Sequence, residues 1–95
     1  MEVFHKDFIE GLEEIIDLSK KVNGEDRDKI FSMIHEHIEE IHELYSKGDK
    51  HWAVETGDLI ILCLELLLFE DKDIDGILSK CISRFKTKLV SLLSE

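Results

Sequence analysis

The segment Trp52–Phe69, WAVETGDLIILCLELLLF, limits most strongly what this chain can fold into. Positions 59–64 are all apolar, and the apolar run resumes after Glu65. A helix with apolar residues on every side is not a surface helix, so we expect it to be buried nearly all round. It nevertheless carries Glu55, Asp58 and Glu65, which a helix would place on one stripe about 80° wide. Carboxylates on a buried helix are costly without a positive partner, and the identity of that partner is the central question for function.

The whole chain has the composition and periodicity of helices. It has no proline and 5 glycines in 95 residues, and apolar residues recur at three- and four-residue spacing. Asn23-Gly24 and Lys47-Gly48-Asp49 are stop signals, and Asp73 or Asp71 is a plausible N-cap. We therefore predict one all-α domain over residues 1–95. Its four helices are expected at 2–22, from Asp26 or Asp28 to Ser46, 50–69 and 74–93.

Three of these helices have an apolar face. For the first, it comprises Phe4, Phe8, Leu12, Ile15 and Ile16, with Ile9 as a further candidate. For the second, it comprises Ile30, Ile34, Ile38, Ile41, Leu44 and Tyr45. For the fourth, it comprises Ile74, Ile77, Leu78, Cys81, Ile82, Phe85, Leu89 and Leu92.

The acidic charge balance limits which partners the chain is expected to bind. With 12 basic and 22 acidic residues the net charge is −10, which argues against nucleic-acid polymers and means that a phosphate ligand would need a metal ion. Nothing in the sequence predicts a disulfide between Cys63 and Cys81, which favours a reduced, cytoplasmic protein. No signal peptide is visible, and the apolar run is too short and too broken by Glu65 to span a membrane.

The second predicted helix is unusually acidic. Glu36, Glu39 and Glu43 share the face opposite its apolar stripe, and no lysine or arginine lies between residues 30 and 46. Taken alone, this face is most simply a solvated surface. Like charges three and four residues apart repel, however, and natural surface helices usually mix signs.

The second and third helices are joined by a short turn, so they should form an antiparallel hairpin. Glu36 and Glu39 can then face Glu55 and Asp58 at similar height. Four such carboxylates cannot all stay ionised without cations, and two Mg²⁺ ions would neutralise them. Oxygen ligands favour hard divalent metals, Mg²⁺ first and Mn²⁺ as the alternative, over zinc.

The spacing Glu36-x-x-Glu39, fifteen residues, Glu55-x-x-Asp58 resembles the ExxE…ExxD signature of the MazG-like all-α nucleoside triphosphate pyrophosphohydrolases. The string Val54-Glu-Thr-Gly-Asp-Leu-Ile is similar to the family's ELGDLL segment, and the resemblance covers residues 30–85. It implies hydrolysis of a nucleoside triphosphate to the monophosphate and pyrophosphate. It also implies that these four carboxylates hold Mg²⁺, and that the chain assembles into a helical-bundle homodimer or homotetramer.

Several alternatives stay open. Glu40 and Glu43 offer a second ExxE, one turn along the helix. Lys80 and Arg84 lie in the only cationic concentration of the sequence and are candidate phosphate contacts. The simpler interpretation is that these cations suit the C-terminal half of a helix. A phosphoribosyl-ATP pyrophosphohydrolase has similar acidic spacing. A non-catalytic acidic interaction module and a di-metal redox bundle, built from Glu39, His42 and their symmetry mates, are the alternatives from other classes.

Overall fold

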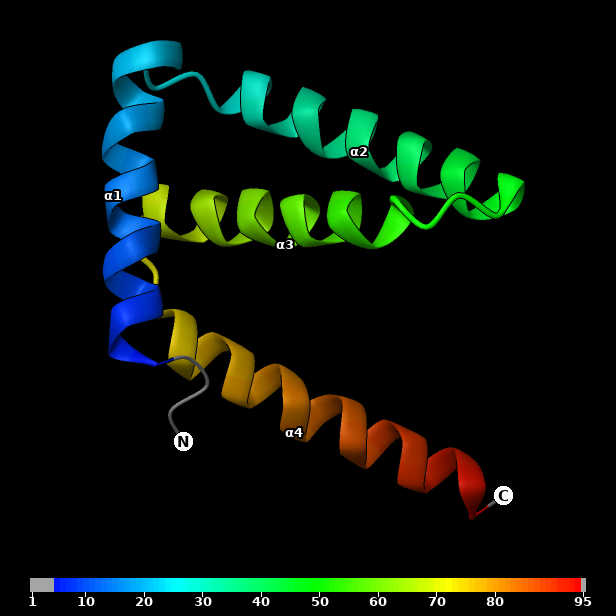
Figure 1. Cartoon of the computed structure of the whole chain (residues 1–95). Coiled ribbons are helices and arrows are strands. Elements are labelled where there is room, and N and C mark those ends of the chain that lie inside the picture. The colour runs from blue at the N-terminus through cyan, green and yellow to red at the C-terminus, as the bar shows by residue number, and fades with distance from the viewer. Residues whose placement is uncertain (1–4, 95) are drawn as a thin grey trace.

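The computed structural model describes residues 5–94, which form four α-helices and, within that range, no strand. They are α1 (Lys6–Asn23), α2 (Arg27–Lys47), α3 (Trp52–Phe69) and α4 (Ile74–Leu93) (Figure 1). The all-α, four-helix prediction is confirmed, and the ends of α2, α3 and α4 lie within two residues of their predicted positions. The first helix begins at Lys6 and not at residue 2, with His5 as its N-cap. Residues 2–4 and the side chain of Phe4 lie outside the described residues.

The helix ends follow from local chemistry. The Asp26 carboxylate accepts hydrogen bonds from the backbone N–H groups of Asp28 (3.0 Å) and Lys29 (3.4 Å), two donors that the first turn of α2 leaves unpaired. Gly48 ends the same helix with φ 74° in the left-handed region, where a side chain is disfavoured. These two residues fix where the acidic helix begins and ends.

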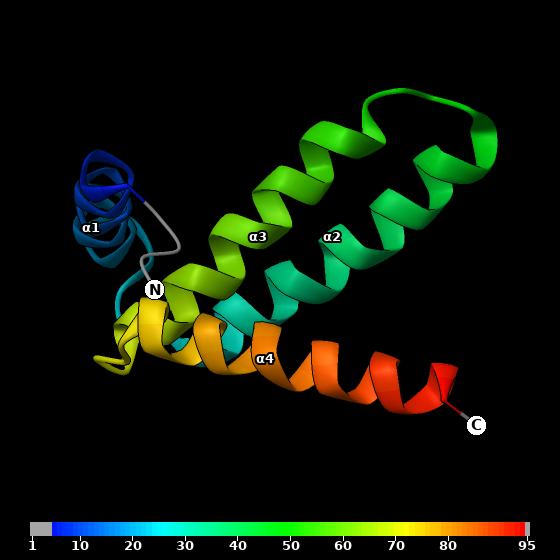
Figure 2. The ribbon, with the colours of Figure 1, turned by 90° about the horizontal axis from the view of Figure 1, so that it is seen from below.

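The helices form an open frame and not a closed bundle. α2 and α3 run antiparallel, side by side, while α1 crosses the open end of this hairpin (Figures 1 and 2). α4 starts beside α1 and then diverges from α3 (Figure 1). The α2–α3 hairpin, α1 and the start of α4 therefore meet at one end of the molecule.

The core lies at that end. It consists of two small clusters, one of Leu12, Leu64 and Ile74 and one of Ile16, Ile30 and Phe69. The ring of Phe69 also carries two cations, with Lys20 Nζ 5.0 Å and the Arg27 guanidinium carbon 4.9 Å from its centroid. Arg27 Nε in turn donates to Glu70 Oε1 at 2.8 Å. Phe69 thus ties α1, α2 and α3 together.

Replacing Phe69 by alanine should therefore lower the free energy of unfolding by about 3–5 kcal/mol, because a buried ring is lost and a cavity is left. Phe31→Ala is the matched control, since Phe31 is 47% exposed, and it should cost less than about 1 kcal/mol. Urea unfolding followed by circular dichroism measures both variants. Equal losses would show that the cluster around Phe69 is not the core of the hairpin.

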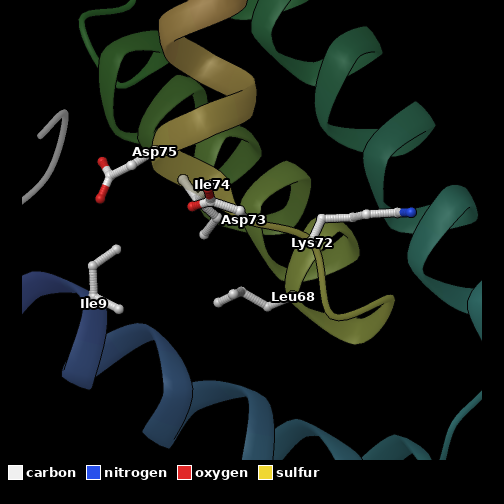
Figure 3. A pocket seen from close by; sticks show the side chains of 6 residues that line it. All are labelled: Ile9, Leu68, Lys72, Asp73, Ile74 and Asp75. Atoms are coloured by element: carbon white, nitrogen blue, oxygen red, sulfur yellow. The ribbon is translucent and has the colours of Figure 1, made fainter. Parts of the chain in front are cut away.

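A shallow hollow of about 170 Å³ marks the point where α4 leaves α1. Ile9, Leu68 and Ile74 form its floor, and Asp73 and Asp75 lie on its rim (Figure 3). The Lys72 side chain extends away from the other lining residues (Figure 3). Its apolar floor belongs to one of the core clusters, so this hollow anchors the start of α4.

The prediction that Trp52–Phe69 is buried nearly all round is wrong for a single chain. Val54 and Ile60 are 56% and 51% exposed, because the diverging α4 leaves one side of α3 uncovered. The apolar stripes are also narrower than predicted. On α2, the stripe is rotated, so that Met33 and His37 are half-buried while Ile38 and Tyr45 are exposed. Elsewhere the predicted apolar residues that are exposed are Phe8 and Ile15 on α1 and Ile82, Phe85, Leu89 and Leu92 on α4.

Membrane insertion can be assessed for the described part of the chain. None of its four helices combines the length and the apolar character needed to cross a bilayer.

Candidate metal centre

Three potential metal ligands converge between the two helices of the hairpin. His37 of α2 and Glu55 and Asp58 of α3 each offer one ligand atom, and these atoms all lie within 4.8 Å of one another. His37 and Glu55 are half-buried, with side chains 23% and 13% exposed, and Asp58 is exposed. The two carboxylates come together because they lie three residues apart on α3, and His37 meets them because the helices run antiparallel.

The orientation of the His37 ring is informative. Its Nδ1 lies 2.8 Å from the backbone oxygen of Met33, and a carbonyl oxygen only accepts, so Nδ1 carries the proton. In the neutral ring, Nε2 then presents a lone pair, and it lies 3.4 Å from Glu55 Oε2. A lone pair facing a carboxylate oxygen is unfavourable unless a proton or a metal ion lies between them. A histidine that donates its other ring N–H to a backbone carbonyl is also the usual arrangement of a metal ligand.

Glu55 lies between two histidines. Its Oε1 is 3.3 Å from Nε2 of His51, which is 55% exposed and stands one helical turn earlier. The backbone N–H of His51 donates to Asp49 Oδ1 at 2.9 Å, which fixes the start of α3. Among residues 5–94, no lysine or arginine forms an ion pair with Glu55 or Asp58. Within the described residues, the side chains closest to the Glu55 carboxylate are therefore the imidazoles of His37 and His51.

The structure brings together two of the four predicted carboxylate ligands. Glu55 and Asp58 belong to the group, whereas Glu36 and Glu39 are exposed on α2 and do not belong to it. In the alternative register, Glu43 binds Lys47 Nζ at 2.7 Å, and this hydrogen bond lowers the pKa of Glu43 below its usual value. Glu43 is thus already paired. Glu40 is also exposed, one turn after His37.

The remaining predicted contacts lie elsewhere. Lys80 and Arg84 are exposed on α4, and α4 diverges from the hairpin that holds the group (Figure 1). Glu39 and His42, the basis of the redox alternative, are both exposed and are not among the residues that converge.

His37 is the member of the group that the sequence analysis missed. The signal was its position: it lies seven residues after Ile30 and seven before Leu44, the spacing that keeps a residue on one face of a helix. A polar residue in the middle of an apolar stripe would have marked it.

The chain was compared with protein-family models, with characterised proteins and with solved structures, and nothing matches in any of the three comparisons. A functional interpretation therefore depends on the residues of the hairpin and their geometry.

Proposed function

We propose that this protein is a divalent-metal-dependent hydrolase that converts a nucleoside triphosphate to the monophosphate and pyrophosphate. The observation that carries the proposal is the convergence of His37 Nε2 with the carboxylates of Glu55 and Asp58. These two carboxylates are also the ExxD half of the resemblance to the MazG-like pyrophosphohydrolases. Geometry and sequence pattern thus point to the same two residues.

Glu55 and Asp58 would hold the metal from α3, with His37 as the ligand from α2. Mg²⁺ is the expected ion, and the imidazole nitrogen makes Mn²⁺ a strong competitor. A metal bound there would neutralise the phosphates and activate the attacking water. Glu36 and Glu39 flank His37 on α2, and their exposure leaves them free to act as further ligands once a cation and phosphates are present.

In the proposed reaction, water attacks the α-phosphorus and the bond from this phosphorus to the bridging oxygen breaks. Pyrophosphate leaves with that oxygen. The proton lost by the water passes to Glu55, and His51 at 3.3 Å from Glu55 Oε1 can relay it to solvent because His51 is exposed. Each carboxylate oxygen of Glu55 therefore has a separate role.

We also propose that the working form is a homodimer or homotetramer. The second half of α4 exposes Phe85 (61%) and Leu89 (57%), and α3 exposes Ile60 (51%). A second copy would cover these apolar side chains. Lys80 and Arg84 of one copy are then candidate phosphate contacts for the site of the other.

A non-catalytic module that binds a basic partner is the second candidate. The exposed acidic face with Glu36 and Glu39 supports it, because a uniformly negative surface attracts cationic partners. It requires neither turnover nor a metal, which separates it cleanly from the hydrolase.

The test is pyrophosphate release over a panel of nucleoside triphosphates, deoxynucleoside triphosphates and phosphoribosyl-ATP. We expect turnover with Mg²⁺ or Mn²⁺ and none after chelation by EDTA, because no lysine or arginine within the described residues replaces the metal at Glu55 and Asp58. Calorimetry should show binding of the metal to the protein. No turnover on any substrate, together with no metal binding, would contradict the hydrolase and favour the interaction module.

A further inference from the structure

An open groove of about 330 Å³ lies between α1, α2 and α3, away from the hollow at the start of α4. Leu18 and Ser19 of α1, Met33 of α2 and Leu62 of α3 are among the residues that line it. Its walls are mainly apolar, and its polar members are Ser19, Asn23 and Glu65. A groove of this kind, apolar with a few polar groups, is typical of a small-molecule site.

Glu65 is the unusual residue of this groove. Its side chain is buried, with 4% of the residue exposed, and Oε1 has no hydrogen-bond partner among the described residues. No cation of α4 forms an ion pair with it within residues 5–94. Burying a carboxylate oxygen without a partner is costly, so the partner is expected from outside the described residues. A ligand with N–H donors, entering the groove, would supply it.

The groove and the candidate metal centre are linked through Met33. Met33 lies in the wall of the groove and accepts the hydrogen bond of His37 Nδ1. On α3, Glu65 follows Asp58 by seven residues, which places the two carboxylates on the same side of the helix and about 10 Å apart along its axis. Leu62 lies between them. A single extended molecule can therefore occupy both places.

We propose that this groove binds the base of the nucleotide whose phosphates lie at His37, Glu55 and Asp58, and that Glu65 selects guanine. The proposal rests on the hydrolase function proposed above. Leu18, Leu62 and Met33 offer apolar surfaces to a flat ring, and the span from Asp58 to Glu65 suits a ribose and a base. A carboxylate is an acceptor, and guanine alone among the common bases presents two adjacent N–H donors on one edge.

The test compares GTP with ITP, which lacks the exocyclic amino group of GTP and is otherwise the same. The wild type should prefer GTP by roughly ten- to hundredfold in kcat/KM, because a hydrogen bond to a buried charged acceptor is lost with ITP. In Glu65→Gln, this preference should fall to less than about threefold, with the loss seen mainly for GTP. Glu14→Gln removes an exposed carboxylate of α1 outside the groove and should keep the wild-type preference.

A second measurement does not depend on turnover or on the folding of a variant. Guanosine, without phosphates or metal, should shift the amide resonances of Met33, Leu62 and Glu65 in the NMR spectrum of the wild type. Inosine should shift them at least about tenfold more weakly at equal concentration.

The outcomes separate the two proposals. Guanosine shifts at these residues without any turnover would overturn the hydrolase and keep the groove assignment. Turnover with equal preference for GTP and ITP, or with a preference unchanged in Glu65→Gln, would overturn the role of Glu65. A Glu65→Gln variant that loses only self-association would also overturn it, since a cation from a second copy would then be the partner of the carboxylate.

Discussion

Asp58→Asn is expected to reduce metal-dependent release of pyrophosphate about a thousandfold or more. Loss of a metal ligand forfeits several kcal/mol of transition-state stabilisation, and each 1.36 kcal/mol is about a factor of ten. The same change should leave the fold intact or stabilise it, because Asp58 lies beside Glu55 and neither forms an ion pair with a lysine or arginine of residues 5–94. Pyrophosphate release, metal calorimetry and thermal unfolding are the measurements.

Glu14→Gln is the control for this variant too, since it removes one exposed carboxylate outside the hairpin and should keep the wild-type rate. His37→Ala tests the ligand from α2 and should weaken metal binding, while Glu39→Gln tests the ligand predicted from the sequence. If Asp58→Asn keeps the wild-type rate, the metal does not lie at the convergence of α2 and α3.

Phe85→Glu on α4 is expected to convert the assembled protein to monomers. The ring is 61% exposed in one chain, and a second copy that covers it would have to bury the new charge, which costs at least about 2 kcal/mol or thirtyfold in dissociation constant. Sedimentation velocity across a concentration series measures the change.

Ser83→Glu is the matched control for Phe85→Glu. It adds the same charge to the same helix, two residues earlier and about 200° around the axis, at an exposed position. It should leave the association unchanged. A wild type that sediments as a monomer at all concentrations, or equal effects of both variants, would contradict an interface on the apolar face of α4.

The helices and their ends could be predicted because each depends on neighbouring residues. α1 ends at Asn23-Gly24, and Asp26 caps the start of α2. Gly48 supplies the positive φ that ends α2, and Asp73 precedes α4 at the predicted position. Glu55 and Asp58 could be paired in advance for the same reason, since three residues along one helix set their distance.

What could not be predicted depends on how the helices rotate and meet. Ile38 was assigned to the apolar stripe of α2, and a small rotation of this helix exposes it and turns His37 toward Glu55. A helix pattern fixes which residues share a face, but the centre of the contact depends on the partner helix. The exposure of Ile60 depends on the divergence of α4, a tertiary feature with no local signature.

The position of the core has a consequence for the opposite end of the hairpin. Ile30 on α2 and Leu64, Glu65 and Phe69 on α3 are the buried residues of these helices, and all lie toward α1. The end near Gly48 is closed by the edge-on contact of Tyr45 with Trp52, whose ring centroids are 5.3 Å apart. α2 and α3 are therefore held together by buried residues at the end near α1 and by this aromatic contact at the end near Gly48. A cation held by His37, Glu55 and Asp58 would link α2 to α3 between these two ends. Binding of the cation and closure of the hairpin would then be a single equilibrium.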